Sequence, residues 1–356
     1  MGAFHFIKAI KNHNENLEDK SKEIKPIIGC EFNVCEDSND KSRRDDGFQT
    51  VFLAKNKRGY HNLSKMSSLA QTTGFYYVPR IDKEIVRMYK DDLIVLSGNL
   101  YGEISSKVLN VGERQAEESL VWWKNEFKDD FYIEIMRHQQ ENESRVNKTL
   151  LAFSKKHNIS IVATNNTYYT KKEDANAHDI LLCLKDGEKQ STPIGKGRGF
   201  RYGLPNQEYY FKSQEEMKDL FLDLPEAILN CSKVFEKITP FDLDNEVLLP
   251  KFEIPKDYDS KSEKGIEKEN AYLKHLTFIG AKNRYEKISN EIEERLNFEL
   301  EVIANTGYPG YFLIVQDFIA AAREMGVSVG PGRGSAAGLS LIHISEPTRQ
   351  AEISYA

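Results

Sequence analysis

Short apolar segments alternate with helix-like segments over the first half of the chain. The clearest apolar segments are KPIIGCEFNV, FQTVFLA, DDLIVLSG, DFYIEIM and ISIVATN, and amphipathic stretches such as GERQAEESLVWWKNEF lie between them. Apolar runs of this length favour strands, whereas apolar residues spaced three and four positions apart favour helices. The alternation therefore predicts an α/β fold of βα units with a mostly parallel sheet, either open or closed into a barrel.

Polar residues follow several of these predicted strands. Glu31 comes after PIIGC, His138 after EIMR, and Asn165 and Asn166 after IVAT. In parallel sheets and barrels the carboxyl ends of the strands form the usual site face, so these residues are the first candidates for chemistry. The alternative is that they only cap the strands toward solvent, and the pattern leaves both interpretations open.

A long loop is predicted over residues 185–206 from its glycine, serine and proline content. Its basic residues Lys196, Arg198 and Arg201 suit contacts with a nucleic-acid backbone, although a solvated loop is the favoured interpretation. Helices are expected afterwards, since Ser213 and Glu216 have capping-box spacing and Pro225 suits the first turn of a helix.

Two more helices are predicted near the end, over residues 295–304 and 311–325. The second should place Phe312, Val315, Phe318, Ile319 and Ala322 on one apolar face. A short strand over 327–329 should follow and lead into the glycine-rich sequence GPGRGS.

A glycine-rich loop that leads into a helix directs backbone N–H groups and the positive end of the helix dipole at one point. In GPGRGS, Arg333 and Ser335 add a guanidinium group and a hydroxyl group, which suit phosphate. Glycines also occur in such turns because they adopt positive φ angles or allow close packing. The loop sequence alone therefore does not show whether it binds phosphate or only forms a tight turn. No Gly-Lys-Ser/Thr closes it, so it is not a Walker A loop.

Composition narrows the possible classes of protein but does not indicate a function. The chain has 356 residues, 40% of them hydrophobic, a formal net charge of −6 and four cysteines without a CxxC pair. Two domains fit this length, and neither a disulfide framework nor a zinc ribbon is indicated. No apolar run reaches the roughly 18 residues of a membrane helix, and the start lacks a secretory pattern, so a cytoplasmic protein is expected.

The block GYPGYFLIVQDFIAAAREMGVSVGPGRGSAAG resembles the alpha subunits of bacterial DNA polymerase III, a family of replicative polymerases. KPIIGCEFNV, GYHNLSKMSSLAQTTGFYYVPRIDKEIV and ATNNTYYTKKEDANAHDILLC resemble the same family in the same order. The resemblance implies a PHP-type distorted βα barrel lacking its first strands over residues 1–240. It also implies a mainly helical segment over 241–338 that opens a palm similar to polymerase-beta-like nucleotidyltransferases.

This family carries out DNA replication as DNA-directed DNA polymerases. The resemblance implies that Gly332, Arg333, Gly334 and Ser335 hold the triphosphate of the incoming nucleotide. The palm aspartates that bind two Mg²⁺ ions belong to a PDxDxDF-like strand, which this sequence lacks, so the chain by itself is expected to be inactive. The implied partners of the complete protein are primer-template DNA, deoxynucleoside triphosphates, a proofreading 3′–5′ exonuclease subunit, a sliding clamp and a clamp loader.

The PHP domain has its own metal positions in some relatives, and Glu31 and His138 match two of them. The His-x-His and Thr-Asp-His motifs are missing, and Asn166-Thr167-Tyr168 replaces a late Asp-x-His motif. An amide and a phenol are poor ligands for divalent ions, so no working cluster is expected. His178 is expected to pack rather than to bind metal. The alternatives to a polymerase piece are a metal-dependent phosphoesterase and a non-catalytic PHP module.

Both ends of the chain look unnatural by the same comparison. Met1 matches an internal methionine of the family. After Gly338 the sequence LSLIHISEPTR is what a transposase-end sequencing adapter would encode, so residues 339–356 are expected to be an artefact and His343 should not be a ligand.

Overall fold

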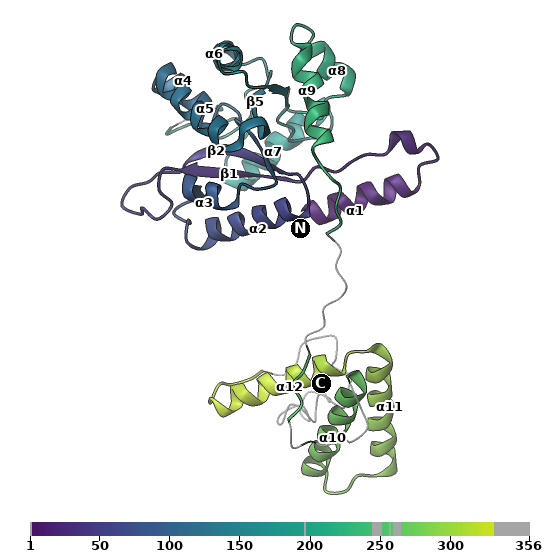
Figure 1. Ribbon diagram of the computed structural model, residues 1–356. Coiled ribbons are helices and arrows are strands. Elements are labelled where there is room, and N and C mark those ends of the chain that lie inside the picture. Colours follow the sequence, from purple (N-terminus) through teal and green to yellow (C-terminus); the bar gives the residue numbers. More distant parts are fainter. Residues whose placement is uncertain (1, 196, 244–250, 256–257, 259–264, 331–356) are drawn as a thin grey trace. The chain divides into compact units, whose positions relative to one another are not determined.

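The computed structural model describes residues 2–195, 197–243, 251–255, 258 and 265–330. The chain divides into two compact units, Met1–Leu243 and Asp244–Ala356. Figure 1 shows the first as a mixed α/β unit and the second as a group of helices. Each unit is described by itself below.

A six-stranded sheet organises the first unit. Its strands are β1 (Gly29–Cys35), β2 (Phe48–Ala54), β3 (Arg80–Asp82), β4 (Leu93–Leu96), β5 (Phe131–Ile135) and β6 (Ile161–Ala163), in the spatial order β3-β1-β2-β4-β5-β6. The α/β fold with βα units is confirmed, and each of the five apolar segments contains a strand. However, β2 runs antiparallel to both neighbouring strands, β1 and β4. Residues 36–47 connect β1 to β2 without a crossover helix, so the chain reverses direction between these two strands.

Nine α-helices, from seven to seventeen residues long, surround this sheet in the described part of the first unit. They are α1 (Gly2–Glu15), α2 (Lys57–Thr72), α3 (Lys83–Tyr89), α4 (Glu103–Asn110), α5 (Glu113–Phe127), α6 (Glu141–His157), α7 (Ala175–Asp186), α8 (Gln214–Leu220) and α9 (Pro225–Glu236). The predicted helix starts are confirmed. Ser213 and Glu216 form a capping box at α8, and Pro225 opens α9.

Apolar side chains cover both faces of the strands, as the long apolar runs require. On one face Phe52 is fully buried, and its ring lies 5.7 Å from that of Phe32 and 6.1 Å from that of Trp123. On the other face Ile94, Tyr132 and their neighbours pack with the end of α9 in a smaller cluster. Since side chains alternate along a strand, Glu31 and Glu134 share the face of this smaller cluster.

The second unit contains α10 (Ile266–Arg284), α11 (Asn290–Thr306) and α12 (Pro309–Glu324), which correspond to the predicted helices and one more before them. Leu273, Leu300, Ile303 and Leu313 form their core. Gly307 ends α11 with φ +77°, a conformation that glycine adopts without strain. The residues of the predicted strand 327–329 are not in a strand, because none of the described residues pairs with them.

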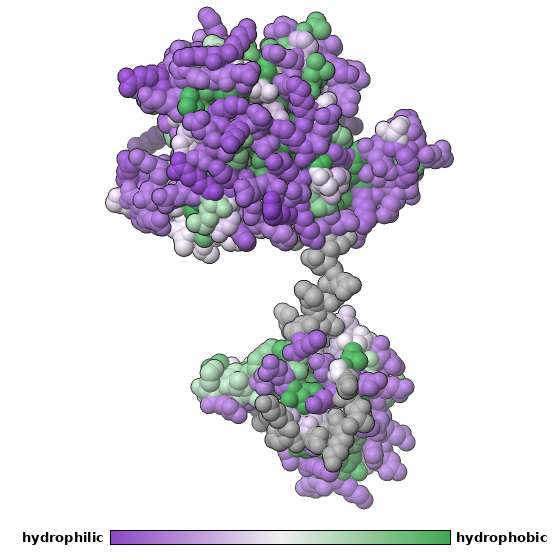
Figure 2. All heavy atoms as spheres, in the orientation of Figure 1, coloured by the Kyte–Doolittle hydropathy of each residue, from purple (hydrophilic) through white to green (hydrophobic). Residues whose placement is uncertain are grey.

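The predicted apolar face of α12 is only partly correct. Of the five predicted residues only Ile319 is buried, and Phe318 is 57% exposed, whereas Leu313, which the prediction did not include, is fully buried. Figure 2 shows apolar surface along α12, where Phe318 and Met325 are exposed. None of the described helices is both long and apolar enough to cross a membrane.

Candidate functional site

The predicted phosphate loop cannot be placed, since Gly332, Arg333, Gly334 and Ser335 lie outside the described residues, as does His343. The structure places His138, Asn165 and Asn166 near the ends of β5 and β6 in the first unit, and Glu31 within β1.

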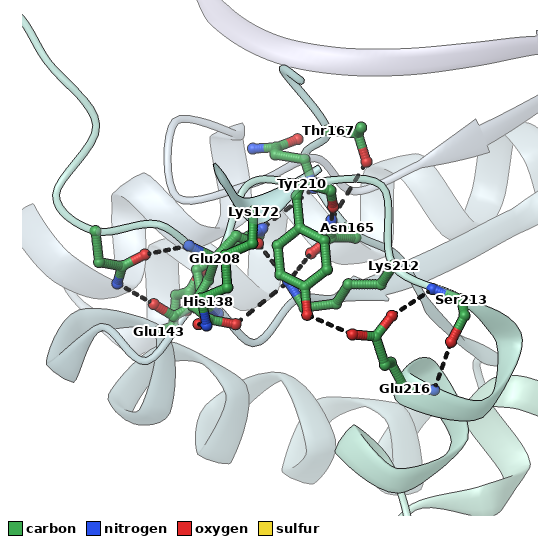
Figure 3. A network of polar contacts seen from close by, with 12 residues as sticks. His138, Glu143, Asn165, Thr167, Lys172, Glu208, Tyr210, Lys212, Ser213 and Glu216 are labelled. Atoms are coloured by element: carbon green, nitrogen blue, oxygen red, sulfur yellow. Dashed lines mark hydrogen bonds and ion pairs between the residues drawn. The ribbon is translucent and has the colours of Figure 1, made fainter. Parts of the chain in front are cut away.

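His138 is held in a fixed orientation just after β5. It is 1% exposed. Glu143, in the first turn of α6, accepts a hydrogen bond from the His138 backbone N–H at 2.6 Å and contacts the ring Nδ1 at 2.7 Å (Figure 3). The backbone N–H of Asn166 donates to Nε2 at 3.2 Å. The imidazole is therefore neutral, with its proton on Nδ1 donated to the Glu143 carboxylate.

Tyr209 completes the surroundings of this histidine. Its ring stacks on the imidazole with the centroids 4.4 Å apart and an angle of 9° between the planes. Burial raises the pKa of the Tyr209 phenol, so this side chain stays neutral. His138 is thus packed and hydrogen bonded, and the solvent-facing strand cap is excluded for it.

These residues do not fit a PHP-type metal cluster. A ligating imidazole needs a nitrogen lone pair directed at the ion. Nε2 of His138 faces the Asn166 N–H, and Nδ1 faces Glu143. Glu31 is an exposed residue of β1, and partial desolvation raises the pKa of its carboxyl group. Among the described residues, no three His, Cys, Asp or Glu side chains are grouped to hold an ion.

The residues in place of the Asp-x-His motif have other contacts. Thr167 accepts a hydrogen bond from the Asn165 amide at 3.3 Å, and the Asn165 amide also donates to the Tyr210 carbonyl at 2.9 Å. The Tyr168 ring lies 5.6 Å from the ring of His178. His178 therefore packs against aromatic side chains, in agreement with the expectation.

A cavity of about 350 Å³ opens beside His138. The ends of β4 and β5, the start of α6 and the segment 202–209 line it, and its polar side chains include Tyr101, Glu134, His138, Glu143, Tyr168 and Tyr209. A volume of this size is at the lower end of the range of small-molecule sites.

Sequence reasoning missed Glu134, as it missed Glu143 and Tyr209. Glu134 is 5% exposed, and its Oε2 atom has no hydrogen-bond partner among the described residues; the same holds for the Thr164 hydroxyl. Burial raises the pKa of Glu134 to about 7, and the negative charge of Glu31 on the same sheet face adds to this. The available signal was one charged residue inside the apolar run FYIEIM.

The long connection between α7 and α8, residues 187–213, forms part of the cavity wall. Arg201, a predicted nucleic-acid contact, is buried and forms two hydrogen bonds with Asp179 of α7, at 2.6 and 2.9 Å. It also donates to the Thr192 carbonyl at 2.8 Å. The nucleic-acid interpretation of Arg201 is therefore wrong, because its guanidinium group is used inside the protein. Arg198 is exposed, and Lys196 lies outside the described residues.

A second set of contacts fixes the end of this connection, as Figure 3 shows. Glu208 pairs with Lys172 at 2.8 Å and with Lys212 at 3.4 Å. The Tyr210 hydroxyl donates to Glu216 at 2.7 Å, and this hydrogen bond raises the pKa of the phenol to about 12. The end of the connection is therefore tied to Lys172, just before α7, and to α8 by charged and hydrogen-bonded groups.

Two domain families match parts of the chain. The family described as "PHP domain" matches residues 1–138, and the family described as "Bacterial DNA polymerase III alpha NTPase domain" matches residues 271–349. The first match includes Glu31 and His138. The second includes α11, α12 and the residues Gly332 to Ser335.

Several similar proteins have the same name. The chain is 38% identical over 326 residues to DNA polymerase III subunit alpha of Borreliella burgdorferi, covering 90% of this chain and 27% of that protein. It is 36% identical over 345 residues to the subunit of Campylobacter jejuni, covering 90% and 28%. The Treponema pallidum subunit is 36% identical over 341 residues, covering 94% and 27%. The chain spans a little over a quarter of the length of these relatives, and over that span it is similar to the alpha subunits of bacterial DNA polymerase III.

Proposed function

We propose that the chain acts as part of a DNA-directed DNA polymerase that extends a primer during DNA replication. The observation that carries this proposal is the similarity to proteins named DNA polymerase III subunit alpha along 90% of the chain, through both matched domains. Because only a little over a quarter of those proteins is covered, the activity is proposed for a longer protein rather than for these residues alone.

Within that protein we assign residues 1–240 to a PHP domain, 241–338 to the start of the polymerase domain, and 339–356 to an adapter-derived tail. The PHP domain would serve as a structural module, since both ring nitrogens of His138 are already hydrogen bonded. This arrangement does not favour the alternative of a metal-dependent phosphoesterase.

The loop containing Gly332, Arg333, Gly334 and Ser335 would bind the triphosphate of the incoming nucleotide. Glycines let the backbone N–H groups approach phosphate oxygens, and the guanidinium group of Arg333 suits them as a charged fork. Two Mg²⁺ ions, when bound, would activate the primer hydroxyl and stabilise the charge of the displacement. Their ligands would be aspartates of a PDxDxDF-like strand, a motif absent from this sequence.

The further partners of the longer protein would be primer-template DNA, deoxynucleoside triphosphates, a proofreading exonuclease subunit, a sliding clamp and a clamp loader. We place it in the cytoplasm. The 356-residue chain alone should not extend a primer, because it lacks the proposed metal ligands.

Primer extension by the longer protein tests the phosphate loop. Ser335→Ala should weaken the use of deoxynucleotides about tenfold, and Arg333→Ala should weaken it more, because a charge-assisted contact is lost. Arg114→Ala is the matched control, since Arg114 is exposed on α5 and, within the described part of the chain, its ion pair is with Glu118 on the same helix. Unchanged kcat/KM in both loop variants would refute the assignment. Extension by the 356-residue chain would refute its expected inactivity.

A further inference from the structure

The cavity beside His138 has an unusual charge balance. Of the described residues that line it, none is lysine or arginine, whereas Glu134 and Glu143 both are part of its wall. A cavity lined in this way disfavours phosphate and other anions, because no positive side chain offsets the carboxylates.

Glu143 adds a second carboxyl group to this wall. It is 5% exposed, and its two oxygens contact the backbone N–H and the ring Nδ1 of His138. No lysine or arginine among the described residues pairs with this carboxyl group.

Glu134 lies close to the negative charge of Glu31, and no lysine or arginine among the described residues of the cavity wall offsets it. Its Oε2 atom and the Thr164 hydroxyl are both buried and make no hydrogen bond of ordinary geometry within the described residues, although Thr164 is near enough to lower the pKa of the carboxyl group. Burial and the charge of Glu31 disfavour ionisation of its carboxyl group. A cation in the cavity would offset both effects, and it would give the carboxylate a partner.

Aromatic rings form much of the remaining wall. Tyr101, Tyr168, Tyr202 and Tyr209 all line the cavity, and burial raises the pKa of Tyr168, Tyr202 and Tyr209, so these phenols remain uncharged. The faces of such rings attract cations, most strongly where water is excluded. No three His, Cys, Asp or Glu side chains among the described residues are grouped to hold an inorganic ion.

We propose that this cavity binds a small organic ammonium ion, which pairs with the Glu134 carboxylate and contacts the rings of Tyr168 and Tyr209. The ammonium group supplies the charge that the wall lacks, and its alkyl groups fill the space between the rings. None of the residues lining the cavity belongs to the proposed triphosphate loop, so this proposal can be tested independently of polymerase activity.

Calorimetric titration of the full chain with choline tests the charge requirement. The control ligand is 3,3-dimethylbutan-1-ol, which has the shape of choline without the positive charge. Choline should bind, and the uncharged alcohol should bind at least tenfold more weakly, because it gains neither the ion pair nor the cation–π contact. Absence of choline binding, or equal binding of the two compounds, would overturn the proposal. Pyrophosphate should not compete with choline, and competition would also count against it.

Two variants locate the bound choline. Glu134→Gln removes the charge but keeps the shape, and Tyr168→Leu removes a half-exposed ring. Each should weaken choline binding at least fivefold. The matched controls are Glu118→Gln on the exposed side of α5 and Tyr311→Leu in the second unit, since both side chains are largely exposed. Wild-type affinity in Glu134→Gln, or an equal loss in the controls, would show that choline binds elsewhere.

Discussion

At the scale of single residues, two buried glutamates of the first unit show that partners decide the charge state. Burial disfavours the charge of Glu103, yet Lys83 at 2.9 Å and Lys107 at 2.8 Å outweigh it and lower the pKa to about 2. Trp123 adds an indole N–H at 2.9 Å. Glu134 has no such cations, so burial raises its pKa to about 7. The first carboxylate stabilises the fold in its ionised form, and the second does not.

Glu134→Gln should therefore change the pH dependence of stability. Above the unfolded-state pKa of about 4.3, the unfolded chain loses a proton that folded Glu134 retains up to about pH 7. The folded state binds more protons in this window, so its stability falls as the pH rises, by up to about 3 kcal/mol. Glutamine does not titrate. The unfolding free energy of the variant minus that of the wild type should be about 2 kcal/mol larger at pH 8 than at pH 5. Urea unfolding at both pH values measures this difference. An equal difference at both pH values would contradict the raised pKa.

The sequence predicted part of the site at this scale. His138 and Asn166 were identified as strand-end residues, and the structure brings them into hydrogen-bond contact. Glu134 was missed because its position inside a strand does not reveal whether a cation lies beside it. Arg201 was misassigned for a related reason, since its partner Asp179 is 22 residues away in the chain.

At the scale of elements, apolar runs were sufficient for β1, β2, β4, β5 and β6, but β3 was missed. β3 has three residues, and Arg80 and Asp82 within it are polar. Arg80 is nevertheless fully buried, because it donates to the backbone carbonyls of Gly74 at 3.1 Å and Asp45 at 2.9 Å. Such long-range backbone partners leave no hydrophobic pattern. The antiparallel direction of β2 was equally hidden, since strand periodicity is the same in both directions.

The connection between α7 and α8 should loosen when its internal anchor is removed. Arg201→Met keeps much of the side-chain volume but removes the contacts with Asp179 and the Thr192 carbonyl. Hydrogen exchange of the described residues 187–209 should become at least tenfold faster, because their local opening then costs less free energy. Arg198→Met, at an exposed position of the same connection, is the control and should leave exchange unchanged. Unaltered exchange in Arg201→Met would mean that other contacts hold the connection.

At the scale of the whole molecule, each unit has its own apolar core. The first contains all the described strands and both clusters on the sheet, and the second has a separate core around Leu300 and Leu313. Residues 1–243 made alone should therefore fold and unfold in one cooperative transition. Circular dichroism during urea unfolding measures this directly.

Phe52→Ala in the same 1–243 chain tests whether the larger cluster governs that transition. Phe52 is fully buried among Phe32, Trp123 and Phe127, so truncation should cost about 3 to 5 kcal/mol of unfolding free energy. The control is Phe75→Ala, since Phe75 is 47% exposed and should cost far less. A similar small loss in both variants, or a gradual transition in the parent chain, would mean that the first unit lacks a core of its own.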